Sequence, residues 1–296
     1  MSEIVAPAPA VAPRVTLDST LFLVAPAAIF VLALFIFPFV YGFVLSFTPM
    51  KGDNWLANYQ RFFSEPAFRD TIAKTLYLAV PSTLINVLLA VPIAYSIRQP
   101  SGYQRALTTF LVIPITLGTV LIAQGLLTYL GPQGWVNRTL MFFSLIDSPI
   151  RLVHNYWGVL LAIIISGFPF TFLLTLSYIT GIDPSLPRAA ATLGAGPFEQ
   201  FRRIYLPLLM PGVTVAFCLT FVQAFSVFPS AVLLGAPAGP TRVISIAAYQ
   251  SAFEDYDYSM ASAVAMVMGV VQLAVVAAVL GARQLFYRGP ASGGKG

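Results

Sequence analysis

The residue types that most often carry out enzyme chemistry are scarce in this sequence. It has one cysteine, Cys218, and one histidine, His154, among 296 residues. One cysteine can form neither an intrachain disulfide nor a cysteine-based metal site. The sequence also lacks a glycine-rich phosphate loop followed by Lys-Ser or Lys-Thr. We therefore expect no catalytic residue, no metal site and no cofactor on this chain.

Charged, aromatic and helix-breaking residues gather in the segment 181–212. Asp183 can cap a first helix that begins with Pro184, and Gly194 can end that helix. Pro197 can open a second, short helix, and two further prolines mark the return to the apolar sequence. The segment predicts two short helices separated by a glycine-containing turn.

The second short helix is amphipathic. Phe198 and Phe201 are three residues apart and share a face, whereas Arg202 and Arg203 point elsewhere. Basic residues beside aromatic ones suit a helix that lies on lipid headgroups. They equally suit a helix that inserts into a groove on a partner protein. The residues alone favour neither alternative.

The composition places this segment in a membrane protein. The chain is 58% hydrophobic and 9% charged, whereas a soluble domain is about 25% charged. Six segments contain no Asp, Glu, Lys, Arg or His, and each is long enough for the roughly 20 apolar residues of a membrane-spanning helix. Because lipid offers the backbone no hydrogen bonds, these spans should be helices. We predict an all-α membrane protein with six spans, near residues 21–47, 76–97, 107–130, 156–180, 209–228 and 258–280.

The chain divides into one membrane domain and two terminal segments. Residues 1–18 are rich in Ala and Pro and are expected to be disordered and cytoplasmic. Residues 19–284 form the membrane domain, and residues 285–296 form a cytoplasmic tail. If both termini are cytoplasmic, nine of the 16 Lys and Arg residues lie on that side. This bias favours both termini inside.

Uncharged polar residues stand within the predicted spans. Asn86, Gln124 and Gln223 are candidates for lining a transport pathway, although each can instead make a hydrogen bond between helices. The predicted spans contain no Asp, Glu, Lys, Arg or His, the residues that mark ion and proton pathways within a membrane. This argues against a proton-coupled antiporter or a voltage sensor.

The loop between the fourth and fifth spans resembles the signature loop of the membrane subunits of binding-protein-dependent ABC importers. That signature is Glu-Ala-Ala, three residues, Gly, nine residues and Ile-x-Leu-Pro. Arg188 replaces the signature Glu, so an acidic contact cannot be assumed there. The opening spans also look like those of this family. The matching residues are Ala189, Ala190, Gly194, Ile204, Leu206 and Pro207.

The resemblance implies a type I ABC importer permease fold in a bacterial inner membrane, with a cytoplasmic coupling helix near Pro197–Arg203. It implies a cytoplasmic ATPase dimer that binds ATP and Mg, a second and non-identical permease subunit, and an external or periplasmic solute-binding protein. Nucleic acid is not an expected partner. Phe198 and Phe201 are the expected anchors in the ATPase. The expected coupling loop comprises Arg188, Ala189, Ala190, Gly194, Pro197, Phe198, Phe201, Arg202, Arg203, Ile204, Leu206 and Pro207.

The substrate is less closely defined. The segment 225–268 is most similar to polyamine permeases of the spermidine/putrescine type and to their relatives for iron, phosphonates and opine-like compounds; sugars are a further alternative. The acidic residues Glu254, Asp255 and Asp257 can attract a cation or form an ordinary solvated loop. A secondary transporter or channel is the rival class, but it should show internal repeats or intramembrane charges, and the sequence shows neither. A structural membrane protein would need no helix shaped for an ATPase groove.

Overall fold

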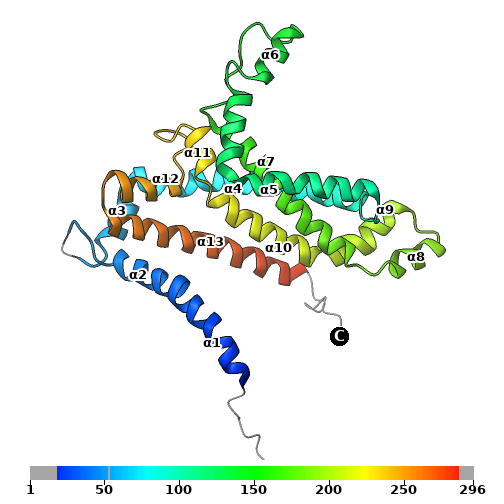
Figure 1. The fold of residues 1–296 in the computed structure, drawn as a ribbon, viewed down its shortest axis with the longest axis horizontal. Coiled ribbons are helices and arrows are strands. Elements are labelled where there is room, and N and C mark those ends of the chain that lie inside the picture. Colours follow the sequence, from blue (N-terminus) through cyan, green and yellow to red (C-terminus); the bar gives the residue numbers. More distant parts are fainter. Residues whose placement is uncertain (1–18, 53, 287–296) are drawn as a thin grey trace, which may run out of the picture.

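The computed structural model describes residues 19–52 and 54–286, and all regular structure within them is helical. Six helical segments in this part of the chain are long and apolar enough to cross a membrane. The predicted six-span, all-α class is therefore confirmed (Figure 1). The expected disordered segment 1–18 and residues 287–296 of the expected tail lie outside the described residues.

The first span consists of α1 (Ser19–Val31), a π-helical turn η1 (Leu32–Ile36) and α2 (Phe37–Ser46). Its α2 end packs against α13 (Tyr258–Phe286), whereas the α1 end diverges from the other helices (Figure 1). Apolar side chains along it are exposed, including Phe35 at 65%. In a membrane this surface is available to lipid or to another subunit.

Three helices form the centre of the bundle. They are α4 (Pro66–Ser96), α7 (Tyr156–Thr180) and α10 (Leu206–Phe225), which pack against one another. Large side chains fill the space between them, and small residues allow close approach. The fully buried large residues of these helices include Leu78, Phe172, Phe221 and Phe225.

One glycine sets the distance between α7 and α10. A Cβ atom at Gly212 would overlap the ring of Tyr178 on the facing helix. We expect Gly212→Val to lower the unfolding free energy by about 1–3 kcal/mol, the usual cost of overpacking a core. The thermal unfolding midpoint of the purified protein measures this. Gly269→Ala on α13 is the control, because no atom lies within 4 Å of its Cβ position; equal midpoints for the two variants would contradict the close approach.

Several helices differ in extent from the predicted spans. The second begins at Pro66 rather than at residue 76, because Arg69, Asp70 and Lys74 continue the helix beyond the apolar stretch. The helix of the fifth span ends at Phe225. Residues 226–228, which we predicted to be helical, are therefore not helical. The length of a charge-free segment reflects how much of the chain can lie in lipid, whereas the length of a helix is set by its backbone hydrogen bonds.

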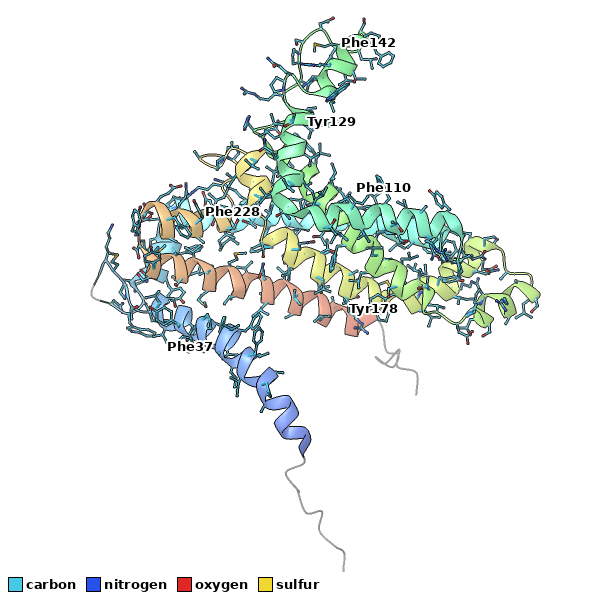
Figure 2. All side chains as sticks on the ribbon, in the orientation of Figure 1. Phe37, Phe110, Tyr129, Phe142, Tyr178 and Phe228 are labelled. Carbon is cyan, nitrogen blue, oxygen red and sulfur yellow. The ribbon has the colours of Figure 1, made fainter. Side chains whose placement is uncertain are left out.

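The third span is interrupted. Helix α5 (Gly102–Leu130) has a non-helical residue at Gly118, with φ 75° and ψ 161°, which a glycine tolerates readily. A short helix, α6 (Trp135–Phe142), follows and extends away from the bundle (Figure 1). Figure 2 shows the side chains of Phe110 on α5 and Phe142 on α6 on outer surfaces, and both are exposed, at 66% and 83%.

The remaining short helices lie at the two ends of the bundle. One end holds α3, α11, α12 and the π-helical turn η3, and the other holds α8, α9 and the π-helical turn η2 (Figure 1). The bounds at the first end are Ala57–Ser64, Pro229–Leu233, Ile244–Tyr249 and Gln250–Glu254. Those at the second end are Ser185–Thr192, Pro197–Gln200 and Phe201–Tyr205.

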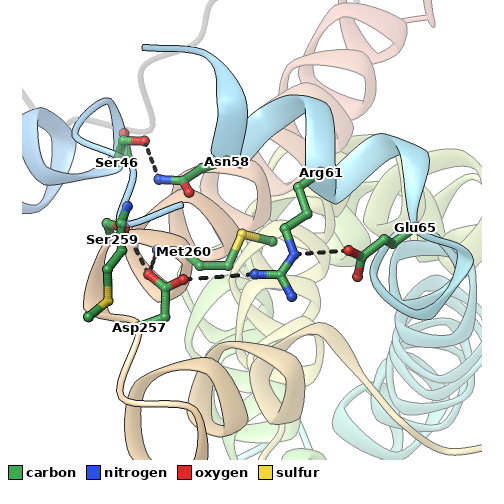
Figure 3. A network of polar contacts seen from close by, with 8 residues as sticks. Ser46, Asn58, Arg61, Glu65, Asp257, Ser259 and Met260 are labelled. Carbon is green, nitrogen blue, oxygen red and sulfur yellow. Dashed lines mark hydrogen bonds and ion pairs between the residues drawn. The ribbon is translucent and has the colours of Figure 1, made fainter. Parts of the chain in front are cut away.

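A polar network joins α3 to the start of α13 (Figure 3). The Asp257 carboxylate accepts hydrogen bonds from the Met260 N–H at 2.9 Å and from the Ser259 hydroxyl at 2.8 Å, and it lies 3.8 Å from the Arg61 guanidinium. Asp257 is only 4% exposed. Its charge is therefore engaged within the fold, and of the three acidic residues in this loop only Glu254 and Asp255 are exposed.

Candidate coupling surface and transport pathway

Helix α8 projects from the end of the bundle (Figure 1). It begins at Ser185, one residue later than predicted, with Pro184 at the N-cap position, and the Asp183 carboxylate accepts a hydrogen bond from the Ser185 N–H at 2.8 Å. Hydrogen bonds from the Ser185 backbone and hydroxyl, with the nearby charge of Arg188, hold the pKa of Asp183 below its usual value. The carboxylate is therefore ionised near neutral pH and keeps capping the helix.

A left-handed glycine ends the projecting helix. Gly194 has φ +88°, and its N–H donates to the Ala191 carbonyl at 3.0 Å. The next N–H, from Ala195, donates to the Ala190 carbonyl at 3.0 Å. Only glycine adopts this φ without strain. The turn therefore explains why the loop pattern has a glycine at this position.

The second helix of the loop does not end where we predicted. From Pro197 the chain is helical through α9, η2 and α10 without a break, although Pro207 was expected to mark a boundary. In the π-helical turn the Leu206 N–H bonds to the Phe201 carbonyl. Widening the helix just before Pro207 accommodates a residue that has no N–H to donate. The second helix of the loop is therefore continuous with the helix of the fifth span, whereas α8 is joined to it by the turn at Gly194.

The structure separates the two predicted aromatic anchors. Phe198 is 76% exposed, but Phe201 is half-buried, with its ring centroid 4.7 Å from that of Tyr95 on α4. Phe201 therefore packs on its own bundle with part of its ring, and its role as an anchor stays a prediction. Sequence reasoning missed Leu193, which is 89% exposed at the end of α8. Its position directly before the glycine of the turn was the available signal.

The other residues of the coupling loop divide between the surface and the bundle. Glu199 is exposed and lies 3.2 Å from Arg203, which partly offsets the positive charge. The exposed surface of the loop thus combines three large apolar side chains, Leu186, Leu193 and Phe198, with a net basic surround. Exposed are Arg188, Ala189, Gly194, Pro197, Arg202, Arg203 and Pro207; half-buried are Ala190, Ile204 and Leu206.

A cluster of aromatic and basic side chains ties the loop to the end of α4. The Tyr95 hydroxyl donates to the Pro197 carbonyl at 3.0 Å, and the Tyr95 ring lies 5.1 Å from that of Tyr205. The Arg98 guanidinium lies 4.0 Å from the centre of the Tyr95 ring and donates to the Tyr205 hydroxyl at 3.2 Å. Together with Phe201, we call these residues the α4 clamp.

The predicted pathway residues fall into two groups. Asn86 on α4 and Gln223 on α10 line one cavity of about 220 Å³ among α4, α5, α7, α10 and α11. Gln124 is exposed on α5 and does not line this cavity. Five other lining residues are also polar: Thr119, Ser166, Thr220, Ser226 and Ser230.

The chain resembles membrane components of solute importers. Residues 73–287 match the family described as "Binding-protein-dependent transport system inner membrane component". The chain is 30% identical over 198 residues to the spermidine/putrescine transport system permease protein PotB of Haemophilus influenzae, covering 64% of this chain and 69% of that protein. It is 31% identical over 215 residues to the probable sulfate transport system permease protein cysT of Prototheca wickerhamii, covering 72% and 82%.

The fold has a solved counterpart. A chain in the crystal structure of a bacterial alginate ABC transporter, in complex with alginate pentasaccharide-bound periplasmic protein, superposes with a TM-score of 0.79 at 24% identity. The match covers 92% of this chain and 96% of that one, and at this identity it supports the fold alone. The family match, over residues 73–287, shows the family as well as the fold. This multi-pass protein therefore belongs to the inner-membrane components of binding-protein-dependent transport systems, the permeases of type I ABC importers.

Proposed function

We propose that this permease moves a polyamine or a related small organic solute into the cytoplasm, driven by ATP hydrolysis on a separate ATPase dimer. ATP and Mg are bound by that dimer. The projecting loop with Leu193 and Phe198 exposed at its tip is the observation that carries the coupling role. Apolar side chains of this size on a rigid projection fit a groove in a partner.

The coupling mechanism follows from the rigidity of the loop. Closure of the ATPase dimer moves α8 and α9, and the unbroken helix from Pro197 to Phe225 carries this motion into the membrane. The α4 clamp passes the same motion to a second helix of the central bundle. A packed element with two arrangements, biased by both ATP and solute, is what coupling requires.

The proposed coupling role fixes the orientation. If α8 contacts a cytoplasmic ATPase, the even number of spans places both termini in the cytoplasm. The opposite end, which holds α3 and α12, then faces an external or periplasmic solute-binding protein. A second, non-identical permease subunit completes the pore and covers part of the exposed apolar surface of the bundle.

The solute is inferred from the relatives. Likeness to the spermidine/putrescine permease supports a polyamine, and likeness to the probable sulfate permease makes sulfate the second candidate. The buried Asp257 is engaged with Arg61 and contributes little attraction for a cation. The exposed Glu254 and Asp255 remain available for steering one.

The experiment is reconstitution of the four components in liposomes, followed by uptake of labelled spermidine and of labelled sulfate. We expect spermidine uptake that requires both ATP and the binding protein. Sulfate uptake under the same conditions would replace the polyamine assignment and leave the importer intact. Failure of any candidate ATPase to co-purify with the permease pair in mild detergent would overturn the proposed coupling.

A further inference from the structure

The cavity lined by Asn86 and Gln223 lies where one helix, α5, is interrupted and another, α10, ends. Thr119, on its wall, follows the non-helical residue Gly118 of α5. Ser226, also on its wall, belongs to the non-helical stretch between α10 and α11. Irregular backbone inside a membrane protein is tolerated where it lines a cavity or is buried in protein. The cavity is therefore associated with the break in the third span and with the end of the fifth.

Asn86 is the most unusual group in the wall of this cavity. The residue is 0% exposed, and neither atom of its amide has a hydrogen-bond partner among the described residues. A buried polar group left in this state costs about 1–3 kcal/mol. Some neighbouring hydroxyls are satisfied, since those of Thr171 and Thr220 bond to each other at 2.8 Å, but the buried hydroxyl of Thr83, one turn before Asn86 on α4, also lacks a partner among the described residues. Of these unpartnered groups, the Asn86 amide is the one that belongs to a residue in the cavity wall.

The facing helix makes room for this amide. A Cβ atom at Gly167 on α7 would lie 2.8 Å from the Asn86 Nδ2. The glycine therefore lets α7 approach the amide without covering it with a side chain. Natural sequences break packing and hydrogen-bonding rules chiefly at functional sites.

The cavity offers hydrogen bonds without charge. Its polar lining consists of amide and hydroxyl side chains, and none of the lining residues is ionisable. An asparagine amide both donates and accepts, so it can pair with an amine through its oxygen or with an oxyanion through its nitrogen. The lining residues carry no charge that could neutralise the charge of a solute held here.

We propose that this cavity is a water-accessible polar station on the transport pathway, where the Asn86 amide and nearby hydroxyls hold the solute by neutral hydrogen bonds. The proposal rests on the transport function proposed above. It assigns solute contact to the station and leaves discrimination by charge to other parts of the importer. In this conformation the amide is covered, so it meets the solute only when the helices around the cavity move during the transport cycle.

Cysteine labelling tests both the access and the neutrality of the station. In a Cys218→Ala background, Ser166→Cys places a thiol in the cavity wall. In the reconstituted importer, cycled with ATP, we expect a cationic and an anionic methanethiosulfonate to modify it at rates that differ less than tenfold, after correction for their rates with a free thiol. Leu273→Cys, at an exposed apolar position on α13, is the unreactive control. No labelling of Ser166→Cys, or a preference of tenfold or more, would overturn the proposal.

A stability measurement tests the role of Asn86 itself. Asn86→Leu replaces an unpartnered amide by a larger apolar group of the same branched shape, and the adjoining cavity of about 220 Å³ offers room for it, so the thermal unfolding midpoint should rise. Thr171→Val is the matched control and should lower the midpoint, because its hydroxyl has a partner. A fall for Asn86→Leu like that of the control would show a structural role and sink the proposal. Neither change touches the coupling loop, so ATPase co-purification separately reports whether the proposed function holds.

Discussion

Replacing Leu193 and Phe198 together by Ala will detach this permease from its ATPase. Both side chains are exposed in the isolated chain, at 89% and 76%. Burying a large apolar side chain contributes about 1.5–3 kcal/mol, so losing two should cost at least about 3 kcal/mol. That corresponds to a more than 100-fold weaker complex. The fraction of ATPase that co-purifies in mild detergent, and its dissociation constant, measure this loss.

Matched substitutions separate this effect from a general loss of surface apolarity. Phe142 and Leu145 are similarly exposed, at 83% and 68%, but they lie in and just after α6, away from the coupling loop (Figure 1). Replacing both by Ala should leave ATPase binding unchanged. If the Leu193 and Phe198 variant retains its ATPase as well as this control does, the loop tip is not the contact.

The two predicted anchors differ in how much of each ring is exposed. Phe198 and Phe201 share a helical face by spacing, and both were predicted anchors. The structure leaves Phe198 exposed but packs Phe201 on Tyr95. Helical spacing reports which residues share a face. It does not report that a ring from a distant helix already covers part of that face.

The sequence predicted most of the architecture because membrane spans obey a simple rule. Charged groups are excluded from lipid, so the charge-free segments marked the six spans. What it could not predict depends on tertiary contacts or on single backbone angles. The break at Gly118 requires a φ of 75° that no neighbouring residue signals. The burial of Asp257 requires Arg61 from a distant segment.

The candidate sites show the same division. The loop pattern located the coupling segment and its turn at Gly194, which the positive φ explains. Of the three predicted pathway residues, Asn86 and Gln223 share a cavity and Gln124 lies elsewhere, and their place on a pathway stays a prediction. A polar residue in an apolar helix is easy to see in sequence. Which face of the helix it occupies depends on how that helix is rotated in the bundle.

Tyr95→Ala will uncouple ATP hydrolysis from transport. It removes the hydroxyl that bonds the Pro197 carbonyl and the ring that packs on Phe201 and Tyr205. Two aromatic pairs and one hydrogen bond contribute about 2–4 kcal/mol in total. The coupling loop remains on its own helix, so the ATPase should still bind and hydrolyse ATP. Solute uptake per ATP should fall at least about tenfold, since 1.4 kcal/mol of lost coupling is a factor of ten.

Two control variants decide whether the clamp transmits motion or only stabilises the fold. Tyr95→Phe keeps both ring contacts and loses one hydrogen bond, about 1 kcal/mol, so its uptake per ATP should fall least. Tyr103→Ala, at a position 67% exposed near the start of α5, should behave as the native chain. If uptake and hydrolysis fall in parallel in Tyr95→Ala, the residue serves stability alone. If neither falls, the continuous helix from Pro197 to Phe225 suffices to carry the motion, because it reaches the central bundle without passing through α4.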